Sequence, residues 1–247
     1  MLENVYMVQP DYSASLVFSG SVLAWTIAYL SIVYYGFADR TYGMPMPALA
    51  ANLSWEAIWA FVIKPFSNIG HVLTIPWLCV DLIIAMQCML YGGNDATEPF
   101  LRKYYRWLFL AAVAIAFPIM YWSFKEFNDW YAEFTAAGDS LLISVLFIGL
   151  LIRRGGVSGQ SMVIAVSKWL GTFLAWIATS LTVNTTPAHL WPSSPWAFVT
   201  ETVRHTAYPL TPLINFLYAV TFVTDILYIV MLRQRLRECG IPLWRRT

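Results

Sequence analysis

The sequence is poor in charged residues. Only 12% of its 247 residues are Asp, Glu, Lys or Arg, whereas 59% are hydrophobic. An ordinary soluble domain carries about 25% charged residues, so too few charges are present to cover a surface that faces water. The net charge of +1 also argues against nucleic acid or another highly charged partner. The composition therefore excludes a soluble globular fold and predicts a polytopic, all-α membrane protein.

The sequence also lacks the motifs that are typical of metal sites and of disulfide bonds. Cys79 and Cys88 fall on one predicted helix and Cys239 in the tail, so no pair is placed to form a disulfide. The predicted spans contain no His cluster, no Asp-rich pair with metal spacing, no Gly-rich phosphate loop and no Ser/His/Asp set. We therefore expect neither a metal nor a cofactor.

Long apolar runs predict a bundle of seven transmembrane helices, because a bilayer core of about 30 Å needs about 20 apolar residues per helix. Their approximate bounds are 12–36, 48–64, 69–91, 105–123, 137–152, 159–182 and 207–232. No repeat or second domain is evident, so residues 1–247 are predicted to form a single domain. The first run lacks a preceding basic segment and a small-residue cleavage site, so we expect it to be a retained span. The longest loop, about 183–206, is expected at the outer interface.

The distribution of Lys and Arg predicts the orientation, because these residues collect on the cytoplasmic side. One side of the predicted bundle would hold Arg40, Arg102, Lys103, Arg106, Arg153, Arg154, Arg233, Arg235, Arg237, Arg245 and Arg246. The other side would hold Lys64, Lys125 and Arg204. The pattern predicts an N-terminus outside and a cytoplasmic C-terminus.

Four ionisable residues lie deep inside predicted spans: Glu56, Asp81, Lys168 and Asp225. A charge at this depth costs about 2.5–3.5 kcal/mol, so such residues face the bundle interior and are functional candidates. With a rise of 1.5 Å per residue, all four lie about 12–15 Å from the cytoplasmic side. We therefore predict that they line one chamber.

Helical spacing adds polar neighbours to these groups. Asn52 lies one turn from Glu56, and a polar stripe runs down the last span. The stripe consists of Asn215, Tyr218, Thr221, Asp225 and Tyr228. A purely structural interpretation is that Lys168 neutralises Asp81 and that Tyr218 hydrogen-bonds between helices.

Three acids share one base at this depth, so at least two carboxyls are expected to lack a cation. A carboxyl without a cation in a dry cavity stays protonated and is a potential general acid. Glu56 and Asp225 are the candidate catalytic acids on this argument.

Aromatic residues make up 17% of the chain and include 12 Trp. Most are expected in interfacial belts and lipid-facing surfaces. Trp25, Trp55, Trp59 and Trp77 instead fall inside spans and near the acids, where their π faces could stabilise carbocations. The expected substrate-binding residues are these four together with Asn52, Asp81, Tyr218 and Tyr228.

The segment Arg40-Thr41-Tyr42-Gly43-Met44, followed by Asn52-Leu53-Ser54-Trp55-Glu56, resembles the integral-membrane terpene cyclases of meroterpenoid and indole-diterpene biosynthesis. Asp225 followed by Tyr228, just before a basic tail, is similar to the second acidic position of that family. The resemblance implies a metal-independent cyclase that acts on a linear prenyl chain attached to an aromatic or polyketide-like head, usually after epoxidation of the terminal alkene.

By position, the resemblance implies that Glu56 and Asp225 are the essential acids. As a hypothesis, Glu56 is the proton donor, oriented by Asn52, and Asp225 is its partner or the terminal base. The expected partners are a prenylated hydrophobic substrate and the lipid bilayer. The expected location is the endoplasmic reticulum membrane of a fungus or the cytoplasmic membrane of a bacterium.

Other functions remain open from the sequence. A proton-coupled transporter also places carboxylates at mid-depth, although such transporters tend to contain two similar halves, which are not evident here. A retinal photosensor requires a lysine in the last span, which has none. A membrane isomerase of sterol type would use the same acidic and aromatic groups on a preformed ring system.

Overall fold

The described part of the chain is entirely helical. The computed structural model describes residues 12–63, 69–129, 132–184 and 210–244. Its seven α-helices are α1 (Tyr12–Ala38), α2 (Met46–Phe61), α3 (Ile69–Tyr91), α4 (Pro99–Glu126), α5 (Glu133–Arg154), α6 (Met162–Asn184) and α8 (Pro212–Glu238), and a short 3-10 helix, η1 (Gly92–Asp95), follows α3. Six of the seven are long and apolar enough to cross a membrane. The predicted all-α membrane class is therefore confirmed.

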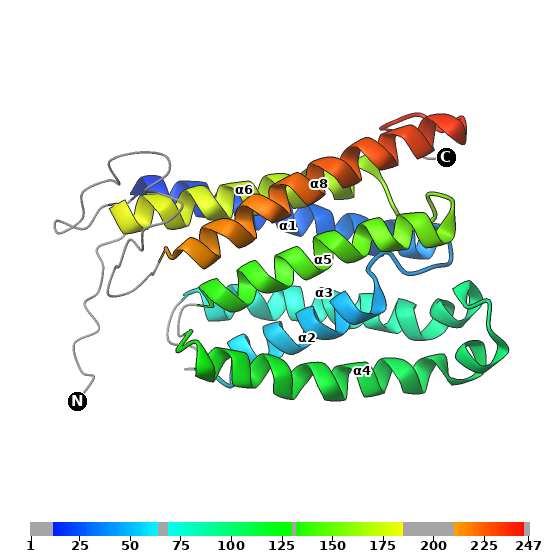
Figure 1. The fold of residues 1–247 in the computed structure, drawn as a ribbon, viewed down its shortest axis with the longest axis horizontal. Coiled ribbons are helices and arrows are strands. Elements are labelled where there is room, and N and C mark those ends of the chain that lie inside the picture. The colour runs from blue at the N-terminus through cyan, green and yellow to red at the C-terminus, as the bar shows by residue number, and fades with distance from the viewer. Residues whose placement is uncertain (1–11, 64–68, 130–131, 185–209, 245–247) are drawn as a thin grey trace.

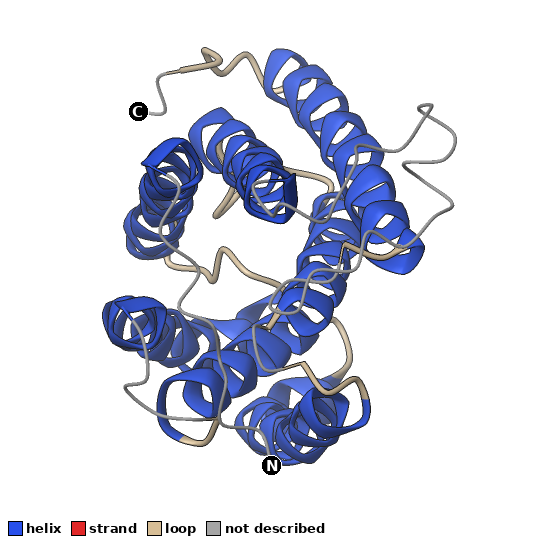
Figure 2. Cartoon of the chain, turned by 90° about the vertical axis from the view of Figure 1, so that its left-hand side faces the viewer, coloured by secondary structure: helices blue, strands red, loops and turns tan. Residues whose placement is uncertain are grey.

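Six of the helices form a closed ring. α1 packs against α6, α6 against α8, α8 against α5, α5 against α2, α2 against α3, and α3 against α1. Figure 2, which looks along the long axis, shows the helices arranged around a common centre. α4 lies outside this ring against α2 (Figure 1) and is the least buried of the long helices.

α2 was predicted as a membrane span, but it is not among the six helices that are long and apolar enough to cross a membrane. It has 16 residues, which corresponds to about 24 Å of helix and is shorter than the bilayer core of about 30 Å. Its packing explains how so short a helix is accommodated, because α3, α4 and α5 all contact it. The helix carries several small residues that are buried and permit this close approach, namely Ala48, Ala50 and Ala51. α2 is thus an internal element of the bundle.

The turn after α1 is fixed by Arg154 at the end of α5. The guanidinium donates to Thr41 Oγ1 at 2.8 Å and to Asp95 Oδ2 at 2.7 Å, and it lies 4.5 Å from the centre of the Tyr42 ring. It also donates to the carbonyl oxygen of Ser158 at 2.8 Å. The Thr41-Tyr42 part of the sequence motif therefore has a structural role. The contacts of Arg154 with Thr41, Tyr42 and Asp95, called the Arg154 clamp below, join α1, η1 and α5.

Glycine is required where this turn meets the one after α5. A Cβ on Gly43 would lie 2.9 Å from the carbonyl oxygen of Gly159. Gly159 itself has a φ of 70°, a conformation that side chains with a Cβ rarely adopt. The approach of the two turns therefore depends on both glycines.

Basic residues concentrate at one end of the described bundle. The C-terminal ends of α1, α3, α5 and α8 and the start of α4 lie together at the right of Figure 1. This end carries Arg40, Arg102, Lys103, Arg106, Arg153, Arg154, Arg233, Arg235 and Arg237, as the orientation prediction requires. Four residues of the orientation prediction lie outside the described residues, namely Lys64, Arg204, Arg245 and Arg246. Nearly all of the predicted 183–206 loop lies outside them too.

Cys79, Cys88 and Cys239 are all free thiols. The expectation that no two of them are bridged is confirmed.

Candidate active site

Glu56 and Asp81 lie in one buried hydrogen-bonded group formed by α1, α2 and α3. The amide nitrogen of Asn52 lies 2.6 Å from Asp81 Oδ2, 2.6 Å from the Tyr29 hydroxyl and 3.3 Å from Glu56 Oε1. The Tyr29 hydroxyl donates to Glu56 Oε1 at 3.2 Å. An amide carries only two hydrogens, so the longest of the three Asn52 contacts, that to Glu56, is the weakest. The predicted Asn52–Glu56 pairing on one face of α2 is confirmed.

Within the described residues, this group has acceptor capacity that is not used. Glu56 Oε2 and Asp81 Oδ1 are buried without a hydrogen-bond partner, and neither carboxyl forms an ion pair with Lys or Arg. A buried polar atom without a partner costs free energy and calls for an explanation. The arrangement is suited to accepting a polar ligand atom or to holding a proton on one of the carboxyls.

Asp139 on α5 is a third buried carboxyl near this group. It is close enough to interact electrostatically with Glu56 and Asp81, and its Oδ1 is also buried without a partner. Thr135 lies one turn before it and accepts a hydrogen bond of 2.9 Å from Trp55 Nε1. Since residues four apart share a helix face, this contact turns the Asp139 face of α5 towards α2.

Lys168 and Asp225 form a second group between α5, α6 and α8. The Lys168 ammonium donates to Asp225 Oδ1 in an ion pair whose side chains are 1% and 0% exposed. A second hydrogen bond, 2.7 Å long, runs from Lys168 Nζ to Ser144 Oγ on α5. Asp225 Oδ2 is buried and has no partner among the described residues.

The pairing of Lys168 corrects the sequence analysis. The purely structural interpretation paired Lys168 with Asp81, but Lys168 binds Asp225, because α6 packs against α8. Asp225 was expected to lack a cation and has one. The four ionisable residues thus form two groups that are not directly hydrogen-bonded to each other in the described structure, and the single chamber predicted from their depths stays a prediction.

The predicted aromatic residues divide into two clusters. In the first, the Tyr29 ring lies 5.9 Å from Trp25 and 6.2 Å from Trp77, and the Tyr29 hydroxyl reaches Glu56. In the second, Trp55 lies 6.2 Å from Trp59, and both pack against Phe124 of α4. The first cluster is thus the one linked to the Glu56 carboxyl, where π faces could stabilise a nearby cation.

Tyr218 and Tyr228 are buried on the same face of α8 as Asp225, as the polar stripe predicted. Tyr228 donates to Gln160 Oε1 at 2.9 Å and packs edge-on against Phe147, with 5.5 Å between ring centres. Tyr218 belongs to a small apolar cluster with Ile214 and Leu210. Neither tyrosine is part of the Glu56 group.

Comparison with known proteins identifies the family. Residues 7–237 match the family described as Pyr4-like transmembrane terpene cyclases. The chain belongs to this family. The resemblance found in the sequence is confirmed, and no solved structure matches the chain.

Curated relatives of this terpene cyclase family are moderately similar to the chain. The Pyr4-family terpene cyclase mfmH of Annulohypoxylon moriforme is 29% identical over 159 residues, which cover 63% of this chain and 65% of that relative. Asnovolin H synthase nvfL of Aspergillus novofumigatus is 25% identical over 75% of this chain and 77% of its own length. Terpene cyclase ascF of Acremonium egyptiacum is 26% identical over 89% of this chain and 80% of its own length.

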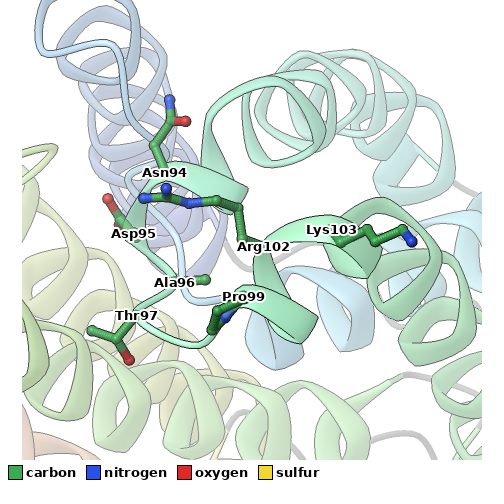
Figure 3. Close-up of a pocket in the computed structure, with 7 residues that line it drawn as sticks. All are labelled: Asn94, Asp95, Ala96, Thr97, Pro99, Arg102 and Lys103. Carbon is green, nitrogen blue, oxygen red and sulfur yellow. The ribbon is translucent and has the colours of Figure 1, made fainter.

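A surface hollow of about 440 Å³ lies away from the acidic groups, where η1 meets the start of α4. Figure 3 shows Arg102 reaching towards Asn94 and Asp95, whereas Lys103 points away. Asp95 is already bound by Arg154. The hollow therefore belongs to the basic end of the bundle and not to the candidate active site of this terpene cyclase family member.

Three residues of the two groups escaped the sequence analysis: Tyr29, Asp139 and Ser144. Tyr29 is one of 14 tyrosines and has no distinguishing sequence pattern. Asp139 fell at the edge of the span predicted at 137–152, whereas α5 begins at Glu133, which places Asp139 more than one turn inside. A better estimate of the start of α5 would have identified it.

Proposed function

We propose that the protein is a membrane-bound terpene cyclase that protonates a linear, terminally epoxidised prenyl chain on a meroterpenoid-type substrate. Glu56 is the proton donor in this proposal, and Asp225 is the second essential carboxyl. The observation that carries it is the Glu56 carboxyl itself, which is buried between two hydrogen-bond donors with one oxygen unused and no cation paired to it among the described residues. Such surroundings favour a neutral acid that can give up a proton.

The reaction begins with transfer of the Glu56 proton to the epoxide oxygen or to the alkene. The electrons of a neighbouring double bond then attack the electron-poor carbon, and each ring closure leaves a new carbocation. Tyr29 donates to the donor carboxyl, and Trp25 and Trp77 lie against the Tyr29 ring. The π faces of this cluster would stabilise the cations by about 0.5–2 kcal/mol each. Loss of a proton from the last cation gives an alkene with the mass of the substrate.

Initiation of the reaction by a protonated side chain is also consistent with how the possible metal ligands are spread over the described residues. In residues 12–63, 69–129, 132–184 and 210–244, no group of three or more His, Cys, Asp or Glu side chains is placed to hold a metal ion. A diphosphate-ionising cyclase would need acidic ligands for divalent cations. We therefore propose a metal-independent mechanism.

Family membership favours cyclisation over the other functions considered. The relatives are named terpene cyclases or a synthase, which gives no support to a proton-coupled transporter. A sterol-type isomerase would use the same buried acids, and its products would differ because no new ring forms. We further propose that the basic end faces the cytoplasm.

The test supplies membranes of a host that lacks such pathways with linear farnesylated and geranylgeranylated aromatic compounds. Each compound is offered with and without a terminal epoxide, and products are followed by mass spectrometry and nuclear magnetic resonance. We expect a cyclised product of unchanged mass from at least one epoxide. Glu56→Gln and Asp225→Asn should both lose it, by about 100-fold or more.

Glu238→Gln is the matched control, because Glu238 lies on α8 with an exposed carboxylate bonded only to Gln234 and Arg235 among the contacts described. It should retain the product. Full activity of either Glu56→Gln or Asp225→Asn would contradict the assignment of that residue. Conversion of a preformed ring system, with no conversion of any linear compound, would support the isomerase.

A further inference from the structure

The ion pair between Lys168 and Asp225 gives the two candidate carboxyls different surroundings. Glu56 is hydrogen-bonded by the neutral groups Tyr29 and Asn52. Asp225 is bound by an ammonium that is fully buried with it. The two carboxyls therefore differ in what holds them, since a cation contacts Asp225 and only neutral donors contact Glu56 in the described structure.

The position of Lys168 is itself held by α5. Ser144 Oγ accepts from Lys168 Nζ at 2.7 Å and donates to the carbonyl oxygen of Ser140 at 2.8 Å. The Phe147 ring lies 5.7 Å from the ammonium. Three helices therefore fix the ammonium on one oxygen of Asp225 and leave the other oxygen, Oδ2, without a partner in the described structure.

Replacement of a buried ion pair by apolar residues is often neutral or stabilising, so stability alone does not account for a lysine at this depth. We propose that Lys168 is a positioning residue that holds Asp225 by Oδ1, so that Asp225 Oδ2 is the base that ends the cyclisation. This inference rests on the proposed function and assigns opposite roles to its two carboxyls.

The proposed step balances without a further reactant. A C–H bond next to the last cationic carbon breaks, and its electron pair forms the new C=C bond. The proton goes to Asp225 Oδ2, while Lys168 keeps all its protons. Because Glu56 gave one proton at the start and Asp225 takes one at the end, substrate and product are isomers.

The experiment compares Lys168→Met and Lys168→Arg with the wild-type protein in the membrane assay, on a substrate that the wild type converts. Folded enzyme is quantified by fluorescence-detected size-exclusion chromatography. We expect Lys168→Met to form the wild-type alkene about 100-fold more slowly. Products in which the last carbocation adds water or loses a different proton should make up a larger share of the total product than they do in the wild type. Lys168→Arg should restore the wild-type product pattern.

Thr172→Val is the matched control, because Thr172 is buried one turn away on α6 and its hydroxyl donates only to the backbone oxygen of Lys168 among the contacts described. It should keep the product pattern. A purely structural role for Lys168 would reduce the amount of folded protein but leave the product ratio per folded enzyme unchanged. A wild-type ratio and rate in Lys168→Met would overturn the inference.

If Lys168→Met does not fold, the double variant Lys168→Met/Asp225→Asn replaces the pair with neutral groups. The inference predicts that this variant loses the wild-type alkene as Asp225→Asn does, and formation of that alkene at the wild-type rate would overturn it. Failure of the proposed function is distinguishable, because the wild type and Thr172→Val would then also give no cyclised product from the full substrate panel.

Discussion

The amide nitrogen of Asn52 lies 2.6 Å from Asp81 Oδ2 and 3.3 Å from Glu56 Oε1. Asn52 thereby joins α2 to α3 and holds two carboxyls in one hydrogen-bonded group. Replacement by an apolar residue of similar size should release both carboxyls. We predict that Asn52→Leu lowers the rate of cyclisation per folded enzyme by about 100-fold, because misplacement of a reacting group by about 1 Å can cost this much.

Initial rates of product formation, normalised to folded protein, check this prediction. Ser54→Ala is the control, since Ser54 is buried on the same helix and its hydroxyl donates to the carbonyl oxygen of Ala50 at 2.7 Å. Its rate should be unchanged. Equal rates in Asn52→Leu and Ser54→Ala would rule out an orienting role for Asn52.

Tyr29 offers a milder test of the same group. Tyr29→Phe keeps the ring between Trp25 and Trp77 but removes the hydroxyl that donates to Glu56. We predict a loss of about 1 kcal/mol in the free energy of unfolding, typical of one hydrogen bond, and a fall in rate smaller than that of Asn52→Leu. Tyr34→Phe, at a site 65% exposed, should change neither quantity. A Tyr29→Phe enzyme with wild-type stability and rate would contradict the prediction.

Arg154 is predicted to matter for stability and not for chemistry. Arg154→Met removes the clamp on Thr41 and Asp95 and should lower the free energy of unfolding by about 3 kcal/mol, as for other partly buried ion pairs that lose one partner. Heating in detergent, followed by size-exclusion chromatography, measures the loss. The exposed pair of Arg235 with Glu238 provides the control, because Arg235→Met should cost less than about 1 kcal/mol. Similar losses in the two variants would disprove the clamp.

Gly171 permits the contact of α6 with the Trp25 ring. A Cβ at this position would lie 2.6 Å from Trp25 Cδ1, so either the ring or the helix must move. Gly171→Ala should cost about 1–3 kcal/mol through overpacking and alter the product ratio, because Trp25 lies beside Tyr29. Gly149→Ala is matched to it, since nothing lies within 4 Å of its added Cβ, and should stabilise α5 by about 0.5–1 kcal/mol. The same unfolding assay in detergent distinguishes the two outcomes.

The helices and local pairings were predictable because they follow from patterns along one segment. Apolar runs located each of the seven helices, and the spacing of four residues between Asn52 and Glu56 placed both on one face of α2. The length and bounds of α2 were predicted less well. Its span was predicted at 48–64, whereas the helix covers Met46–Phe61 and is enclosed by neighbours instead of crossing a full bilayer.

Contacts between helices were not predictable from depth alone. Lys168, Asp81 and Asp225 lie at similar depths, and the choice between the two acids depends on which helix packs against α6. That neighbour is α8, and no spacing within α6 reveals it. Tyr29 reaches Glu56 for the same kind of reason, since its hydroxyl extends from α1 to a residue of α2 only in the folded structure.

The pairing of Lys168 with Asp225 also has a consequence for biogenesis. The two charges lie on helices separated by residues 185–211, and α6 leaves the ribosome before α8. A lone charge at the centre of a membrane helix costs about 2.5–3.5 kcal/mol on insertion, whereas the joined pair is neutral. α6 is therefore without its counter-ion until the last helix is made, and integration of α8 into the bilayer is the step that neutralises it.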